Sequence, residues 1–183
     1  MREEDFYEKT LDRQTIFKGH VIEVALDEVS LADGTKAQRE LVFHNGAVGV
    51  VAVTEQQELI LVKQFRKPLE RTLIEIPAGK IEKGETNPAD VARRELEEET
   101  GMGCEKLEEI FDFVLSPGFS NERMVMYLAT GLYPIAQPKA QDEDERIELM
   151  TVSLAEAFEL MKRKEINDSK TIMALQYLAL RTQ

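Results

Sequence analysis

Residues 79–102 read GKIEKGETNPADVARRELEEETGM and carry signals for both ends of a helix. Asn87 suits the N-cap of a helix, and Pro88 suits the first helical position because its ring presets the backbone angle φ. Gly101 suits the left-handed residue that ends a helix. The segment therefore predicts a helix that starts at Asn87-Pro88 and runs to about Thr100.

Three glutamates share one sector of this predicted helix. At 100° per residue, Glu95 and Glu99 lie about 40° apart and Glu98 lies about 60° beyond Glu95. They sit at the edge of the apolar face formed by Ala89, Ala92 and Leu96. Like charges four residues apart cost a helix roughly 0.2–0.5 kcal/mol per pair. A bound hard cation would offset this repulsion, since carboxylate oxygens suit Mg²⁺ or Mn²⁺. The alternative is a solvated acidic face.

Nine residues of this segment resemble the Nudix box in identity and spacing. In that box, glycines flank a helix that carries an arginine and three glutamates. The matching residues are Gly79, Glu85, Arg94, Glu95, Leu96, Glu98, Glu99, Gly101 and Met102. One departure is that eight residues separate Glu85 from Arg94, where the family pattern has seven. We place the extra residue at Thr86-Asn87, before the helix, which keeps the helical carboxylates in register and leaves the position of Glu85 open.

Four further segments resemble the ADP-ribose pyrophosphatase subgroup of that family. They are Pro77-Ala78-Gly79, Ser116-Pro117-Gly118, the acidic run 142–145 and the segment 170–175. In the subgroup a proline 16 residues beyond the closing glycine of the box marks the substrate, and Pro117 stands 16 residues beyond Gly101. Pro117-Gly118 is expected to form a type II turn in either case.

The resemblance implies a set of metal ligands and the groups that support them. Glu95, Glu99 and the carbonyl group of Ala78 would hold Mg²⁺ or Mn²⁺, with Glu98 as a further ligand or a supporting group. Arg94 would orient these carboxylates. The structural residues of the box would be Gly79, Glu85 and Gly101.

The same resemblance assigns substrate contacts and a general base. Arg66 would contact a substrate phosphate and Glu75 would line the nucleoside pocket, although both also suit ordinary charges at strand ends. Pro117 and Gly118 would lie at the substrate. The loop 137–146 would supply the base, with Glu143 as first choice; Glu145 is second choice and could instead reach a metal. Taken alone, the run 142–145 is more typical of a solvated acidic loop.

The order of predicted elements indicates an α+β protein, and the resemblance specifies a Nudix-type α/β/α sandwich with a mixed sheet. Residues 46–183 would form the Nudix hydrolase domain. Residues 1–45 would form an N-terminal appendage of antiparallel strands, which in the resembled subgroup exchanges between subunits and builds a homodimer. Strands are expected at about residues 20–29, 39–43, 47–53, 59–65, 73–76, 107–115, 124–130 and 147–152, and further helices from residue 154 and at about 169–180.

Composition excludes several other classes of protein. The net charge of −12 over 183 residues opposes binding to nucleic acid. No apolar stretch is long enough to span a membrane, and the acidic N-terminus does not suit a secretory signal, so we expect a cytoplasmic protein. The single Cys104 excludes an internal disulfide and suits a packing residue. His20 and His44 make no zinc-ligand pattern.

The function implied is metal-dependent hydrolysis of the diphosphate bond of ADP-ribose, a small-molecule nucleoside diphosphate sugar, to AMP and ribose 5-phosphate. One alternative is another Nudix activity, on a nucleotide sugar such as GDP-mannose or on an oxidised nucleotide. Another is a catalytically silent Nudix-fold sensor that controls transcription. The sensor would have an eroded box or a basic DNA-binding segment, and this sequence has neither.

Replacing Glu143 with glutamine should lower kcat by roughly 10²–10⁴-fold with little change in KM, the span expected for loss of a general base. Carboxylates that coordinate a cation are weak proton acceptors, so the base should stand outside the ligand set. Steady-state kinetics measure the effect, and Mn²⁺ titration should show unchanged metal affinity. Near-full activity of Glu143→Gln, beside a Glu98→Gln variant that binds metal but does not turn over, would place the base on the helix.

Overall fold

The computed structural model describes residues 2–140 and 146–181. The chain divides into two compact units. One contains Met1–Gly46 together with Phe113–Met124, and the other contains Ala47–Asp112 and Val125–Gln183. Residues 141–145, which include Glu143 and Glu145, lie outside the described part of the chain. No described helix is long and apolar enough to cross a membrane.

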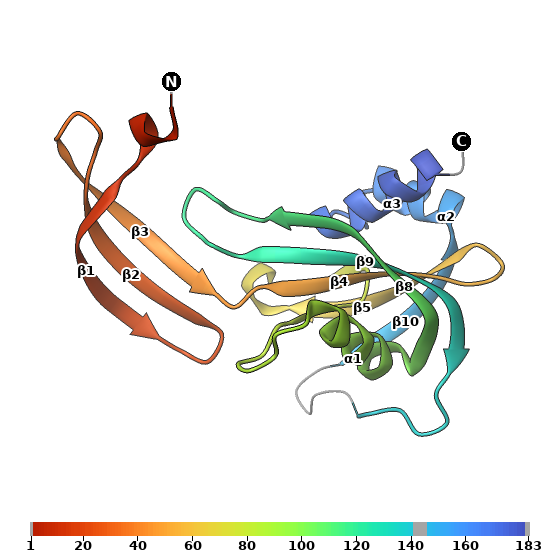
Figure 1. Cartoon of the computed structure of the whole chain (residues 1–183). Helices are drawn as coiled ribbons and strands as arrows, with labels where there is room; N and C mark the ends of the chain where they lie inside the picture. The colour runs from red at the N-terminus through yellow and green to blue at the C-terminus, as the bar shows by residue number, and fades with distance from the viewer. Residues whose placement is uncertain (1, 141–145, 182–183) are drawn as a thin grey trace. The chain divides into compact units, whose positions relative to one another are not determined.

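The N-terminal unit holds a three-stranded antiparallel sheet in the order β1-β2-β3 (Figure 1). Its strands are β1 (Lys9–Lys18), β2 (Ile22–Ser30) and β3 (Lys36–His44), preceded by a short 3₁₀ turn at Glu3–Phe6. Strands β2 and β3 were expected, but β1 was not. All ten residues of β1 are exposed, so no alternation of buried and exposed side chains signals it in the sequence.

The second unit is built on a seven-stranded sheet with the path β10-β5-β4-β9-β8, in which β6 also pairs with β5 and β7 with β4. Strand β4 is fully buried, as its unbroken apolar sequence requires at the centre of a sheet covered on both faces. The strands are β4 (Ala47–Val53), β5 (Glu58–Arg66), β6 (Arg71–Glu75), β7 (Ala78–Lys80), β8 (Met102–Val114), β9 (Arg123–Pro134) and β10 (Ile147–Ser153).

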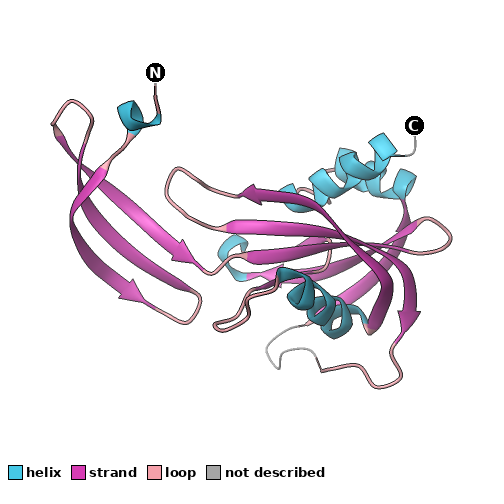
Figure 2. Ribbon diagram, in the orientation of Figure 1, coloured by secondary structure: helices cyan, strands magenta, loops and turns pink. Residues whose placement is uncertain are grey.

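Three helices cover this sheet, with α1 on one face and α2 and α3 on the other (Figure 2). They are α1 (Pro88–Thr100), α2 (Leu154–Lys162) and α3 (Ser169–Arg181), and a 3₁₀ turn at Lys67–Leu69 links β5 to β6. The arrangement is the α/β/α sandwich with a mixed sheet that the resemblance implied. Helix α1 packs Val91, Ala92 and Leu96 against Val48 and Val50 of β4.

The ends of α1 are those that the sequence predicted. The side chain of Asn87 accepts a hydrogen bond from Ala89 N at 3.2 Å, and Gly101 ends the helix with φ of 70°. These caps fix the helical register. Glu95 and Glu99 consequently stand one turn apart beside the buried face.

The turn at Pro117-Gly118 differs from the expected type. Phe119 N donates to the carbonyl oxygen of Ser116 at 3.1 Å, so a turn is present. A type II turn needs a positive φ at its third residue, and Gly118 does not have one. The prediction of a type II turn was therefore wrong.

Candidate active site

The box carboxylates of α1 lie against the backbone of β7. Glu99 is 3% exposed, and its Oε2 accepts a hydrogen bond from Ala78 N at 3.0 Å. Glu95 is 9% exposed and lies over Gly79, where a Cβ atom would overlap the Glu95 carboxylate. A side chain at residue 79 would thus displace Glu95, which explains why this site needs glycine.

Arg94 connects three of the box glutamates. Its Nη1 lies 2.7 Å from Glu98 Oε2 and 2.8 Å from Glu95 Oε1, while its Nε donates to Glu85 Oε1 at 3.0 Å. Burial alone would lower the pKa of the Arg94 guanidinium, but these hydrogen bonds and charges outweigh burial and raise it. Arg94 therefore stays protonated and holds carboxylates that would otherwise repel one another. This geometry supports the orienting role expected for Arg94.

Glu85 contacts helix α1 although the chain carries an extra residue between Glu85 and the helix. Both oxygens of Glu85 accept from Arg94, and Glu85 Oε2 also accepts from Glu82 N at 2.8 Å. The Arg94 hydrogen bond holds the pKa of Glu85 below its usual value. Thr86 and Asn87 lie between this contact and the first helical residue, so the turn absorbs the longer spacing. The position of Glu85, left open by the sequence, is thereby fixed.

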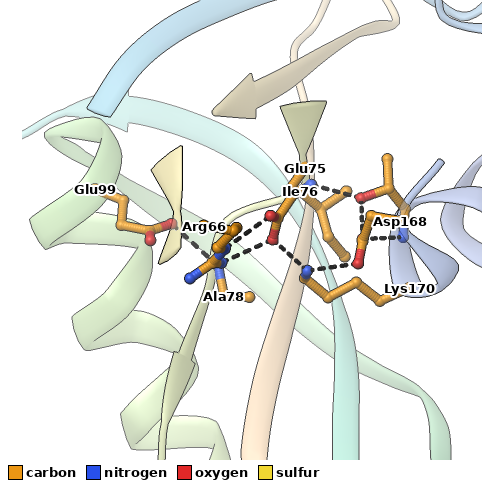
Figure 3. A network of polar contacts seen from close by, with 8 residues as sticks. Arg66, Glu75, Ile76, Ala78, Glu99, Asp168 and Lys170 are labelled. Atoms are coloured by element: carbon orange, nitrogen blue, oxygen red, sulfur yellow. Dashed lines mark hydrogen bonds and ion pairs between the residues drawn. The ribbon is translucent and has the colours of Figure 1, made fainter. Parts of the chain in front are cut away.

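A second set of charges lies at the ends of β5 and β6 (Figure 3). Arg66 donates to Glu75 through two parallel hydrogen bonds, Nε to Oε1 at 2.8 Å and Nη2 to Oε2 at 2.7 Å. Lys170 Nζ donates to the same Oε2 at 2.5 Å. Burial would raise the pKa of Glu75, but Arg66 and Lys170 together bring it below the usual value. Glu75 is therefore a buried carboxylate held ionised by two cations.

Arg66 stands close to the box carboxylates as well. Its pKa is raised, first by the hydrogen bonds to Glu75 and further by the charge of Glu99. Figure 3 shows its guanidinium between Glu75 and Glu99. The two sets of charges thus form one continuous cluster that runs from α1 to α3.

The first turn of α3 closes the far end of this cluster. Lys170 Nζ also lies 3.0 Å from Asp168 Oδ1, while Asp168 Oδ2 accepts from Thr171 N at 3.0 Å and from Thr171 Oγ1 at 2.7 Å. Thr171 Oγ1 in turn accepts from Ile76 N at 2.9 Å. Helix α3 is therefore hydrogen-bonded to the connection between β6 and β7.

The donor set of α1 fits a hard divalent cation by its chemistry. Glu95 and Glu99 bring buried carboxylate oxygens to the Ala78-Gly79 backbone, and oxygen donors of this kind suit Mg²⁺ or Mn²⁺. Within residues 2–140 and 146–181, no three His, Cys, Asp or Glu side chains converge as a metal-ion site. Glu95 and Glu98 instead face Arg94, and Glu99 faces the Ala78 amide.

The predicted site residues fall into three groups. The box residues, Ala78, Arg66 and Glu75 come together in the second unit, whereas Pro117 and Gly118 belong to the N-terminal unit. Glu143 and Glu145 lie outside the described residues. Sequence reasoning did not assign a role to Lys170, Asp168 or Thr171. Lys170 and Thr171 stand in the segment 170–175 that resembles the subgroup, which was the available signal.

The overlap at Gly79 gives a direct test of the site. Gly79→Ala should lower kcat about 100-fold, because displacing a positioned group by about 1 Å can cost that much. Thermal unfolding should reveal only the roughly 1–3 kcal/mol expected of overpacking. Lys83→Ala is the matched control, because it shortens an exposed side chain in the loop that follows β7. Unimpaired turnover of Gly79→Ala would contradict the placement of Glu95.

Comparison with known proteins adds independent findings. The NUDIX domain pattern matches residues 43–175. An ADP-ribose pyrophosphatase of Bacillus subtilis (strain 168) is 49% identical over 174 residues, which cover 95% of this chain and 94% of that protein. A methanol dehydrogenase activator of Bacillus methanolicus is 47% identical over 175 residues, covering 96% and 94%. The crystal structure of an ADP compounds hydrolase has the same fold, with a TM-score of 0.82, 24% identity and coverage of 94% of this chain and 92% of that chain. The resemblance read from residues 79–102 is confirmed: the chain belongs to the Nudix family.

Proposed function

We propose that this protein hydrolyses the diphosphate bond of ADP-ribose to AMP and ribose 5-phosphate. The relative named ADP-ribose pyrophosphatase aligns over almost its whole length, so the N-terminal strands and the box are both included. The observation that carries the proposal is the juxtaposition of buried box carboxylates with Arg66. Such a site can take a cation on one side and a phosphate oxygen on the other.

The residues of the proposed active site have separate tasks in this reaction. Arg66 would donate a hydrogen bond to a phosphate of the substrate, and Arg94 would keep Glu95 and Glu98 in place. Glu143 would accept the proton of the attacking water. The oxygen of that water forms the new bond to one phosphorus atom, and the bridging oxygen leaves with the other phosphate. The chain's residues thus bind, orient and take up one proton.

Glu95, Glu99 and Glu98 are the residues proposed to hold the cation, with the carbonyl group of Ala78 and Glu145 as further candidates. Mg²⁺ or Mn²⁺ is the proposed ion, since both prefer oxygen ligands. A divalent ion bound there supplies Lewis acidity, which stabilises charge on the phosphoryl oxygens and makes water a better nucleophile.

A second candidate is activation of a dehydrogenase partner by the same hydrolytic site. The relative named methanol dehydrogenase activator is about as similar to this chain as the pyrophosphatase is. The two candidates differ in what they require. Hydrolysis of free ADP-ribose needs no second protein, whereas activation changes the rate of a dehydrogenase reaction.

The N-terminal unit supports a homodimer. Apolar side chains of β1 and its flanks are exposed in the single chain, namely Phe6, Tyr7, Leu11, Ile16, Phe17 and Val21. An exposed apolar strand at a sheet edge is an association site. A second copy of this chain is the proposed partner, through residues 1 to about 45.

The function is tested with phosphate release from nucleoside diphosphate derivatives, using Mg²⁺ and a coupled phosphatase. ADP-ribose should be the preferred substrate, and Glu99→Gln should remove nearly all activity. Thermal stability of Glu99→Gln in metal-free buffer should equal or slightly exceed that of the wild type, because the amide relieves like-charge repulsion. Loss of a metal contact should cost several kcal/mol in the reaction barrier.

Glu97→Gln is the matched control, since Glu97 lies on the same helix and its carboxylate accepts a hydrogen bond from the backbone N of Lys139. Retention of more than about a tenth of wild-type kcat by Glu99→Gln, against the loss expected for a metal ligand, would contradict its assignment. Preference for GDP-mannose, or activity seen only as stimulation of a dehydrogenase, would support an alternative function.

Sedimentation equilibrium tests the homodimer. The full chain should be dimeric at micromolar concentration, and Ile16→Glu should shift it toward the monomer because a charge replaces an exposed apolar side chain at the proposed interface. Gln14→Glu, on the same exposed strand, adds a charge without removing an apolar group and is the control. A wild-type monomer at micromolar concentration would rule the dimer out.

A further inference from the structure

Lys170 is a buried lysine at the start of α3, only 7% exposed. Lysine is almost never buried unless it is paired. Its Nζ lies 2.5 Å from Glu75 Oε2 and 3.0 Å from Asp168 Oδ1. The lysine therefore joins a carboxylate of its own helix to one that is 95 residues away in the sequence.

Glu75 transmits this contact to Arg66. One oxygen of Glu75, Oε2, accepts hydrogen bonds from both Lys170 Nζ and Arg66 Nη2, and the other accepts from Arg66 Nε. Three donors from two sides leave the carboxylate little freedom to rotate. A fixed carboxylate plane fixes the plane of the guanidinium that is bonded to it edge to edge.

The free edge of Arg66 points away from Glu75. Because Nε and Nη2 are both engaged by Glu75, the remaining amino group, Nη1, is directed to the other side of the guanidinium. Among the described residues, the hydrogen bonds of Arg66 run through Nε and Nη2 and none through Nη1. Glu99 acts electrostatically on Arg66, so the box carboxylates stand within reach of this guanidinium (Figure 3).

We propose that Lys170 is a positioning residue, which acts through Glu75 to hold Arg66 in the orientation that receives a phosphate of the substrate. The inference rests on the proposed function, in which Arg66 contacts the diphosphate. The described ion pairs of Lys170 are with Glu75 and Asp168, so Lys170 reaches Arg66 through Glu75. Its effect should therefore vanish when Arg66 is absent.

A purely structural role would have a different signature. Helix α3 is already attached to the β6–β7 connection by the hydrogen bond from Ile76 N to Thr171 Oγ1, which does not involve Lys170. If Lys170 only stabilised α3, its loss would weaken binding to the same extent whether or not Arg66 is present. Coupling between two residues, measured in a double-mutant cycle, separates the two roles.

The test measures the Kd of α,β-methylene ADP-ribose, whose bridge cannot be hydrolysed, by isothermal titration calorimetry in Mg²⁺ buffer. Wild type, Lys170→Met, Arg66→Ala and the double variant are compared. Each single substitution should weaken binding about tenfold, and the double variant should bind within about twofold of Arg66→Ala. If Lys170→Met does not fold, Lys170→Gln takes its place in the same cycle, with the same expectation.

Leu178→Ala is the matched control, because it removes buried packing from α3 about two helical turns beyond Lys170. It should leave the Kd unchanged. A Lys170→Met effect that is equal in both backgrounds, or no effect at all, would overturn the positioning role while leaving the proposed function intact. Failure of the wild-type chain to bind the analogue would overturn both, whereas failure to hydrolyse ADP-ribose despite the expected coupling in Kd would overturn the proposed function alone.

Discussion

The crowding of carboxylates at the C-terminal end of α1 is the constraint on which the rest of this structure depends. Acidic groups there oppose the helix macrodipole by roughly 0.3–1 kcal/mol each, in addition to repelling one another. Burial of Glu95 and Glu99 makes the repulsion stronger, since the interior screens charge less than water does. Arg94 offsets part of this cost through its contacts with Glu85, Glu95 and Glu98. The helix is thus less stable than its caps and apolar face would allow, as expected of a site selected for chemistry.

The connection between β6 and β7 is where the two sides of the site meet. Ile76 N is bonded to Thr171 of α3, and two residues later Ala78 N is bonded to Glu99 of α1. These helices cover opposite faces of the sheet (Figure 2). A short backbone segment is therefore held from both sides, and Gly79 directly after it leaves space for Glu95. Thr171 of α3 and Glu99 of α1 consequently fix the position of the same short backbone segment.

Local signals explain most of what the sequence predicted. The cap at Asn87, the glycine at residue 101 and the apolar run of β4 each identify their element without tertiary information. Strand β1 carries no such signal, because all its residues are exposed and its pairing with β2 includes two register shifts. The contact between Lys170 and Glu75 was also beyond prediction, since it depends on how α3 packs on the sheet. A local pattern cannot report a partner that only the tertiary fold brings near.

In the described cluster the carboxylates outnumber the cationic side chains, so the cluster has an excess of negative charge. Six carboxylates, those of Glu75, Asp168 and the glutamates at residues 85, 95, 98 and 99, face Arg66, Lys170 and Arg94, and Lys139 also acts electrostatically on Glu85. Arg66 is moreover paired with Glu75, so it offers a directed hydrogen bond rather than a net charge. A diphosphate brings further negative charge into a protein whose net charge is already −12. In the proposed function, attraction of the substrate would therefore come from bound cations, and the orientation of Arg66 would select the position of a phosphate once that charge is neutralised.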